Sequence, residues 1–206
     1  PKADALLLSD YDKGVLDDAV CAAAIAAAGG KPVLADPKGP GWKKYAGATV
    51  LKPNWREAAE FLASVPQASP PAGSPDDSDA EQAAHRIRRT LGVQNVLVTR
   101  NARGASLACA DGSSLSFPAR AATVQDEAGA GDVVAAVTCL ALAAGASVPV
   151  AAWLGNVAGG AKVAKFGTLT VSVYEILEAL GESFPRSERK LLTRAPDGGD
   201  ATVAAL

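Results

Sequence analysis

Short apolar runs alternate with longer, helix-like segments along most of the chain. Runs of consecutive apolar residues are typical of buried strands, and they predict strands at residues 6–8, 32–35, 48–51, 95–99, 106–110 and 114–118. The longer segments predict helices at residues 17–28, 55–64, 80–91, 131–144, 150–165 and 172–180. This alternation predicts an α/β fold in which helices cover a largely parallel sheet.

Turn and loop residues separate these elements. Gly29-Gly30 follows an alanine-rich run, as a helix C-cap does. Asp111-Gly112 lies between two apolar runs and is a strong β-hairpin signal. Residues 64–80 are rich in Pro, Ser, Gly and Asp, which predicts a loop insertion at the surface. We therefore expect one domain over residues 1–182 that carries this insertion, followed by a polar tail at 183–206.

Three polar motifs directly follow predicted strands: Ser9–Gly14 (SDYDKG), Asp36–Gly39 (DPKG) and Lys52–Asn54 (KPN). The carboxyl ends of parallel strands meet at one edge of the sheet, and ligands bind in the crevice beyond that edge. The sequence therefore predicts a binding site where these three motifs come together.

A glycine-rich loop, Glu127–Asp132 (EAGAGD), leads into the helix predicted at 131–144. Glycines let a ligand approach the backbone closely, and the free N–H groups of a first helical turn attract anions. The carboxylate of Asp132 can accept a proton from an attacking hydroxyl. It can equally serve only as an acid that complements the helix dipole, so the loop by itself leaves both interpretations open.

The composition is that of a soluble globular protein, with 49% hydrophobic and 20% charged residues. The net charge of −2 offers no electrostatic basis for binding nucleic acid, and no apolar run is long enough to suggest membrane insertion. Cys21, Cys109 and Cys139 are odd in number and far apart, which favours a reducing compartment, either the cytoplasm or an organelle matrix. Because the chain starts at Pro1 and contains no Met, we expect a processed or trimmed piece.

An ordered set of motifs resembles those of the ribokinase-like (PfkB) carbohydrate kinases over nearly the whole chain. The motifs are Leu8–Leu16, Asp36–Gly39, Lys52–Glu57, Val98–Arg100, Gly104, Gly129–Asp132 and Gly167–Ser172. Within the family, the kinase half of the bifunctional heptose-7-phosphate kinases is the most similar. The resemblance implies a ribokinase-like fold, of which this chain carries the C-terminal portion and lacks the β-lid region.

The resemblance also implies a phosphoryl-transfer site around the glycine loop. Asp132 matches the catalytic base that deprotonates the acceptor hydroxyl. Gly129, Ala130 and Gly131 match the anion hole that surrounds the transferring phosphoryl group. The family is therefore expected to use ATP to phosphorylate a sugar or a sugar phosphate, here a heptose phosphate because of the Asp-Tyr-x-Lys-Gly run at residues 10–14.

Further matches imply the cofactors, ATP and Mg²⁺. Asn54 and Glu57 match an Asn-x-x-Glu element that positions magnesium and the nucleotide phosphates through water. The matches to the nucleotide-binding surface are Thr99, Gly104 and Asn156. Lys13 and Lys38 lie where a phosphorylated sugar or the nucleotide phosphates would need a cation. Residues 168–172 resemble a segment that binds a monovalent cation in some relatives.

Two departures from the family pattern keep a second interpretation open. Without the N-terminal portion of the fold, the strand at Leu6–Leu8 presents an apolar edge, so we expect a covering chain or the missing N-terminal half to lie against it. Glu127 and Ala128 replace the threonine or small residues that relatives have before the glycines. The alternatives to an active kinase are therefore a catalytically inactive, kinase-derived structural subunit of a larger assembly or, less directly, a bare nucleotide-binding module.

Overall fold

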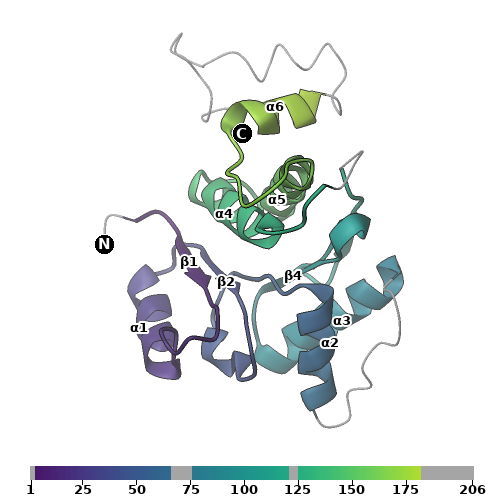
Figure 1. The fold of residues 1–206 in the computed structure, drawn as a ribbon. Helices are drawn as coiled ribbons and strands as arrows, with labels where there is room; N and C mark the ends of the chain where they lie inside the picture. Colours follow the sequence, from purple (N-terminus) through teal and green to yellow (C-terminus); the bar gives the residue numbers. More distant parts are fainter. Residues whose placement is uncertain (1–2, 66–75, 121–124, 182–206) are drawn as a thin grey trace.

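The computed structural model describes residues 3–65, 76–120 and 125–181. In these residues, six strands form one sheet in the order β1-β2-β3-β4-β5-β6. The strands are β1 (Leu6–Ser9), β2 (Val33–Asp36), β3 (Val50–Leu51), β4 (Asn95–Thr99), β5 (Ala105–Ala108) and β6 (Ser114–Phe117). Strands β1 to β4 are parallel, and β5 and β6 extend the sheet as antiparallel strands (Figure 1).

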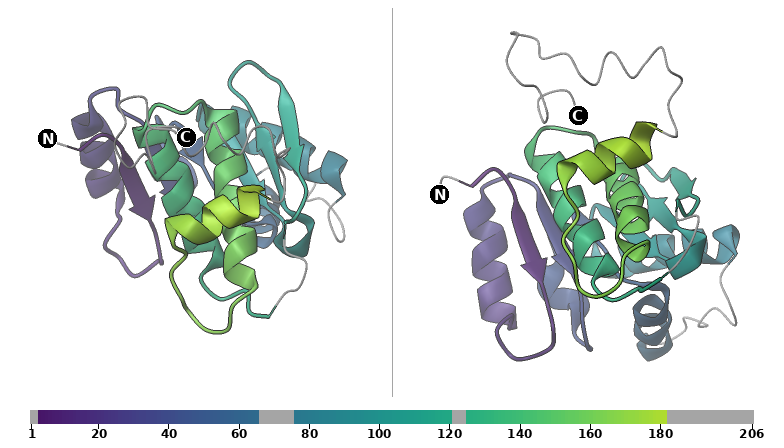
Figure 2. Two further views of the ribbon diagram at one scale, coloured as in Figure 1. Left: turned by 90° about the horizontal axis from the view of Figure 1, so that it is seen from above. Right: turned by 45° about the horizontal axis from the view of Figure 1, so that its top comes forward.

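Helices cover both faces of the sheet. They are α1 (Asp18–Ala28), α2 (Trp55–Ser64), α3 (Asp77–Leu91), α4 (Ala130–Ala143), α5 (Val148–Val163) and α6 (Val173–Gly181). Helices α1, α2 and α3 lie on one side, α4 and α5 lie on the other, and α6 packs outside α5 (Figures 1 and 2). None of the helices in the described ranges is both long and apolar enough to cross a membrane.

The apolar runs of the central strands are explained by burial on both faces. In β2, Val33 and Ala35 belong to the core that faces α1, α2 and α3, whereas Leu34 belongs to the core that faces α4 and α5. Successive side chains of a strand point to opposite faces, so a strand covered on both sides needs apolar residues at every position. The predicted parallel-rich α/β fold is confirmed.

Close packing of α5 against α4 sets the position of the glycine loop, because α4 begins inside that loop. A Cβ atom at Gly155 would lie 2.1 Å from Thr138 Oγ1, and one at Gly159 would lie 2.7 Å from Val134 Cγ2. Only glycine allows the two helix backbones to approach so closely. The N-terminus of α4 is thereby held over the carboxyl ends of the strands.

Several boundaries differ from the sequence predictions. Helix α3 begins at Asp77 rather than at residue 80, because Asp76 caps it by accepting the N–H of Asp79 at 2.8 Å. Two short 3₁₀ helices, η1 (Trp42–Tyr45) and η2 (Asn101–Arg103), were not predicted. Of the predicted loop insertion, residues 66–75 lie outside the described residues, as does the predicted tail.

Strand β1 forms one edge of the sheet. Among the described strands it pairs only with β2, in a parallel register that places Leu7 opposite Leu34. Leu6 and Leu7 are half-buried and Leu8 is buried. That a further segment or chain covers this edge stays a prediction.

Candidate active site

A cavity of about 360 Å³ lies between the strand ends and the N-terminus of α4. Its volume is within the range of small-molecule sites. The structure brings nearly all of the predicted site residues to its lining: Lys38, Asn54, Glu57, Thr99, Gly104, Gly129, Ala130, Gly131, Asp132 and Asn156. Lys13 is the exception, because it is exposed in the loop after β1 and does not line the cavity.

The glycine loop presents an uncapped helix N-terminus to this cavity. Gly129, the N-cap of α4, has a left-handed backbone with a φ of 78° and makes no side-chain capping bond. The N–H groups of a first helical turn have no partner within the helix and can bind an anion, although the N–H of Ala130 already donates to the carbonyl of Glu127 at 3.1 Å. A Cβ atom at Gly131 would lie 3.7 Å from Lys52 Nζ, which places the lysine ammonium directly beside the loop.

Lys52 is a buried cation that the sequence analysis did not single out. It is 2% exposed and its Nζ lies 3.0 Å from Asp36 Oδ1. Burial raises the pKa of Asp36 to about 6, although Lys52 acts in the opposite direction. The sequence signal for a role of Lys52 was the position of its motif, Lys52–Asn54, directly after the strand β3.

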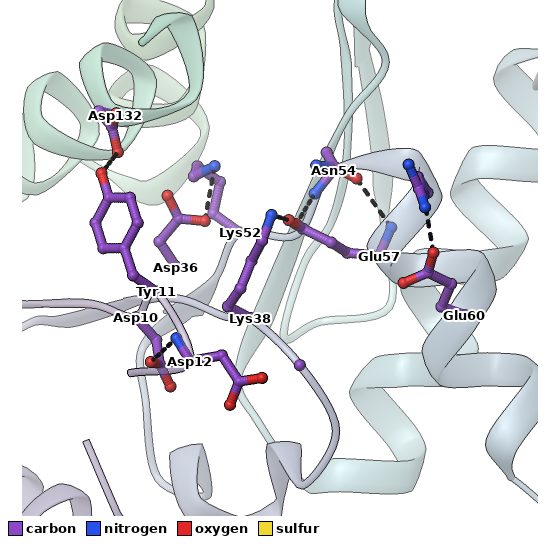
Figure 3. Close-up of polar contacts among 12 residues, drawn as sticks. Asp10, Tyr11, Asp12, Asp36, Lys38, Lys52, Asn54, Glu57, Glu60 and Asp132 are labelled. Atoms are coloured by element: carbon purple, nitrogen blue, oxygen red, sulfur yellow. Dashed lines mark hydrogen bonds and ion pairs between the residues drawn. The ribbon is translucent and has the colours of Figure 1, made fainter. Parts of the chain in front are cut away.

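Asn54 and Glu57 begin α2 as a capping box. The N–H of Glu57 donates to Asn54 Oδ1 at 2.9 Å, and the N–H of Asn54 donates to Glu57 Oε2 at 2.8 Å. Lys38 Nζ lies 2.7 Å from the other carboxylate oxygen, Glu57 Oε1 (Figure 3). The Asn-x-x-Glu spacing therefore has a local structural role, and it also holds a carboxylate and a lysine at the cavity wall.

The predicted nucleotide-binding residues also line the cavity. Thr99 ends β4 and forms an isolated parallel β-bridge with Asn54. Asn156 of α5 is 8% exposed and donates from Nδ2 to the carbonyl of Pro118 at 2.9 Å. Gly104 has a φ of 87°, and a Cβ there would lie 2.0 Å from the carbonyl oxygen of Phe117, so backbone packing already requires this glycine.

The loop after β1 contributes a tyrosine that contacts Asp132. The phenol of Tyr11 donates to Asp132 Oδ1 at 2.7 Å (Figure 3). This hydrogen bond, together with partial burial, raises the pKa of Tyr11. Asp132 lies in the first turn of α4, as predicted, and is exposed there. Tyr11 belongs to the Ser9–Gly14 motif, but the sequence carries no signal for its contact with Asp132.

A carboxylate joins the glycine loop to the segment after α5. Asp126 accepts the N–H groups of Ala128 and Gly167, each at 2.9 Å, and these bonds lower the pKa of Asp126. Lys165 Nζ donates to the carbonyl of Thr170 at 3.0 Å. The segment predicted to bind a monovalent cation thus lies against the loop, and its binding of a cation stays a prediction.

Glu127, which departs from the family pattern, lies at the cavity wall. Glu127 is exposed and lines the cavity, and Ala128 is exposed beside it. Within the described residues, no three His, Cys, Asp or Glu side chains gather closely enough to hold a metal ion by themselves. The oxygen atoms of Asp36, Asn54 and Glu57 contact Lys52, the N–H of Glu57 and Lys38, so the binding of magnesium through water by Asn54 and Glu57 stays a prediction.

Chemically, the cavity combines three functions at one place. An uncapped helix N-terminus and a buried lysine can stabilise a phosphoryl group. An exposed carboxylate, Asp132, can accept a proton. A second lysine, Lys38, offers a point charge for a further phosphate.

Comparison with known proteins identifies related sequences. The profile of the pfkB family carbohydrate kinases matches residues 2–174. The bifunctional protein HldE of Trichlorobacter lovleyi is 42% identical over 193 residues, which are 93% of this chain and 38% of that protein. HldE of Caulobacter vibrioides is 44% identical over 176 residues, which are 84% of this chain and 35% of that protein. The chain thus spans well under half the length of these relatives.

Solved structures show the same fold at lower sequence identity. Phosphofructokinase-2 from Escherichia coli in complex with potassium superposes with a TM-score of 0.71 at 20% identity, over 87% of this chain and 57% of that one. Ribokinase from Arabidopsis thaliana complexed with ribose and ATP gives a TM-score of 0.67 at 23% identity, over 86% and 56% of the two chains. The predicted ribokinase-like fold is therefore confirmed.

Proposed function

Since the chain belongs to the pfkB family of carbohydrate kinases, we propose that it transfers the terminal phosphoryl group of ATP to a hydroxyl of a sugar phosphate. One observation carries the proposal: the uncapped N-terminus of α4, Asp132 in its first turn and the buried Lys52 all meet at one cavity. Phosphoryl transfer needs such positioning and charge stabilisation more than covalent chemistry.

Each of these groups has a defined task in the proposed reaction. Asp132 takes the proton of the acceptor hydroxyl as that oxygen attacks phosphorus. The N–H groups at Gly129 and Gly131 and the ammonium of Lys52 stabilise the charge on the phosphoryl oxygens, whereas the N–H of Ala130 donates to the carbonyl of Glu127. Because Lys52 is buried and paired with Asp36, it needs little reorganisation during the reaction.

Nucleotide and magnesium fit the remaining lining. ATP supplies the phosphoryl group, and magnesium neutralises the charge of its phosphates. Asn54 and Glu57 would hold the ion through water, and Thr99, Gly104 and Asn156 would line the nucleotide end. Lys38 Nζ lies 2.7 Å from Glu57 Oε1, so this carboxylate shares the cavity wall with a lysine.

For the acceptor, we propose a heptose phosphate. The support is the Asp-Tyr-x-Lys-Gly run at residues 10–14, which resembles heptose-phosphate kinases, and the presence of Lys38 in the cavity. Lys13 of the same run is exposed outside the cavity. Lys38 is therefore the better candidate for contacting the acceptor phosphate.

A catalytically inactive structural subunit is the second candidate, and Glu127 favours it. The carboxylate lines the cavity beside the glycine loop. A like charge about 5 Å from a phosphate costs about 1 kcal/mol in bulk water and about 3 kcal/mol at the effective dielectric constant near a protein surface. This second candidate predicts that the cavity does not bind ATP with magnesium.

Titration calorimetry with ATP and Mg²⁺, followed by a phosphoryl-transfer assay, tests the proposal. The wild type and Asp132→Asn are both expected to bind the nucleotide in the micromolar range, because Asp132 acts on the acceptor. Transfer to a heptose phosphate is expected to fall about 10²- to 10⁴-fold in Asp132→Asn. Asp111→Asn, in the β5–β6 turn, is the matched control and keeps wild-type activity. Absence of binding at millimolar ATP would contradict the proposal and support the structural subunit.

A further inference from the structure

Tyr11 joins two loops that are distant in sequence. Its phenol lies 2.7 Å from Asp132 Oδ1, across 121 positions of the chain. The side chain lines the cavity although 59% of the residue is exposed to solvent. A hydrogen bond from a neutral donor to a carboxylate is about twice as strong as one between neutral groups. Tyr11 is thus one wall of the proposed active site and a partner of its proposed base.

The backbone around Tyr11 is anchored on its buried side. Asp10 is 8% exposed and accepts hydrogen bonds from Lys44 Nζ at 2.6 Å and from Tyr45 Oη at 2.5 Å. It also accepts the N–H of Asp12 at 2.8 Å, which folds the chain back immediately after Tyr11. These bonds fix the residues on both sides of Tyr11, so the direction of its side chain is set by the fold.

On the basis of the proposed function, we propose that Tyr11 is a positioning residue for Asp132. Its phenol holds the Oδ1 atom, so that the Oδ2 atom is presented to the acceptor hydroxyl. The proton of that hydroxyl then passes to Oδ2, and Tyr11 keeps its own proton throughout. Holding a catalytic group in its reactive orientation before the substrate binds lowers the entropic cost of the reaction.

The surrounding charges are compatible with this role. Asp36 faces Asp132 from the end of β2, and the negative charge of Asp132 contributes to the raised pKa of Asp36. Lys52 faces the same loop from the end of β3. The hydrogen bond to Asp132 raises the pKa of Tyr11, so the phenol remains a donor near neutral pH.

The test is the Tyr11→Phe variant, which keeps the ring and removes only the donor. We expect kcat to fall about 10- to 100-fold, while KM for ATP and for the acceptor changes less than about threefold because the cavity wall is retained. Tyr174→Phe is the matched control, because Tyr174 is 77% exposed on α6.

A near-ultraviolet titration of the tyrosines provides a readout that does not need turnover. The difference between wild type and Tyr11→Phe isolates the phenol of Tyr11, and its titration is expected at lower pH in Asp132→Asn. An unchanged titration in Asp132→Asn would overturn the proposal, as would a Tyr11→Phe protein with wild-type kcat. If Asp132→Asn loses transfer while Tyr11→Phe does not, only the positioning role fails. If the wild type transfers no phosphoryl group, the proposed function fails and the role of Tyr11 fails with it.

Discussion

Two buried aspartate–lysine pairs lie at the ends of adjacent parallel strands, and they differ in how completely they are satisfied. After β1, Asp10 lies 2.6 Å from Lys44 and also accepts hydrogen bonds from a tyrosine and a backbone N–H. At the end of β2, Asp36 lies 3.0 Å from Lys52 and borders the cavity. The backbone links the two sites, because the N–H of Asp10 donates to the carbonyl of Asp36 at 3.0 Å.

The pKa values of the two aspartates are shifted in opposite directions. Burial alone would raise the pKa of Asp10, but the hydrogen bonds from Lys44, Tyr45 and Asp12 outweigh burial and lower it. Burial dominates at Asp36 and raises its pKa to about 6. Buried charges stabilise a fold only when their partners replace the lost water. The first pair is therefore structural, whereas the second keeps its lysine available for a ligand.

Replacing Lys52 and Lys44 in turn is expected to give the largest contrast between effects on phosphoryl transfer and effects on stability. We expect Lys52→Met to lower phosphoryl transfer about 10²- to 10³-fold, because it removes a charge beside the anion hole. Its unfolding free energy should change by less than about 2 kcal/mol, since Asp36 can take up a proton and become neutral. The measurements are steady-state kinetics and urea unfolding.

Lys44→Met is the matched variant and should show the reverse pattern. Asp10 then keeps its charge in a buried place with fewer donors, so the unfolding free energy should fall by about 2–3 kcal/mol. Transfer should fall less than about tenfold, through loosening of the loop that carries Tyr11. Equal effects of the two substitutions on activity would contradict the comparison.

The pH dependence of stability should carry opposite signs at the two aspartates. The pKa of Asp36 is higher in the folded protein than its ordinary value of 3.8. The stabilisation from Asp36 is therefore complete below about pH 4 and is lost as the pH rises through about 6, by on the order of 3 kcal/mol. The pKa of Asp10 is lowered, so its stabilisation is complete above the ordinary value and is lost as the pH falls through the lowered pKa.

Urea unfolding of Asp36→Asn and Asp10→Asn across the acidic range measures these signs. We expect Asp36→Asn to abolish the loss of stability near pH 6, and Asp10→Asn to abolish the loss at low pH. Parallel pH profiles for the two variants would show that the pairs are equivalent and would refute the distinction drawn between them.

The pair of Lys38 and Glu57, in which the lysine is exposed and the glutamate side chain is 12% exposed, should give the smallest effects. The lysine side chain is 52% exposed, and exposed ion pairs contribute less than about 1 kcal/mol. Lys38→Met should therefore leave urea unfolding almost unchanged, while KM for a phosphorylated acceptor rises about tenfold. Lys13→Met should raise this KM less, because Lys13 lies outside the cavity. A larger effect at Lys13 would show that the acceptor phosphate binds in the loop after β1.

Much of the local structure could be predicted from the sequence. The helices over Trp55–Ser64 and Ala130–Ala143 were predicted to within one residue, because capping and apolar periodicity act over a few positions. The start of α3 was not predicted correctly, because its N-cap residue, Asp76, lies within a polar stretch. The short 3₁₀ helix around Trp42 was also missed, since it is stabilised by the stacking of Trp42 on Phe61, with ring centroids 4.5 Å apart.

The candidate site was predictable in outline, because its motifs follow strands that pair in parallel. The ordered motifs indicated the family, and the position of each motif at a strand end indicated a common cavity. The partners within that cavity were not predictable. Glu57 was expected to act on magnesium, and the structure shows that it also caps α2 and neutralises Lys38.

The sequence by itself determined the strands, the helices, the glycine loop and the family to which they belong, because these depend on short-range patterns. Only the tertiary structure decided which lysine meets which aspartate, that Tyr11 reaches Asp132, and that Lys38 lines the cavity whereas Lys13 does not. The physical reason is that such contacts depend on strand register and on the close packing of α5 against α4. Residues 121 positions apart then meet within 2.7 Å, a distance that no local pattern in the sequence encodes.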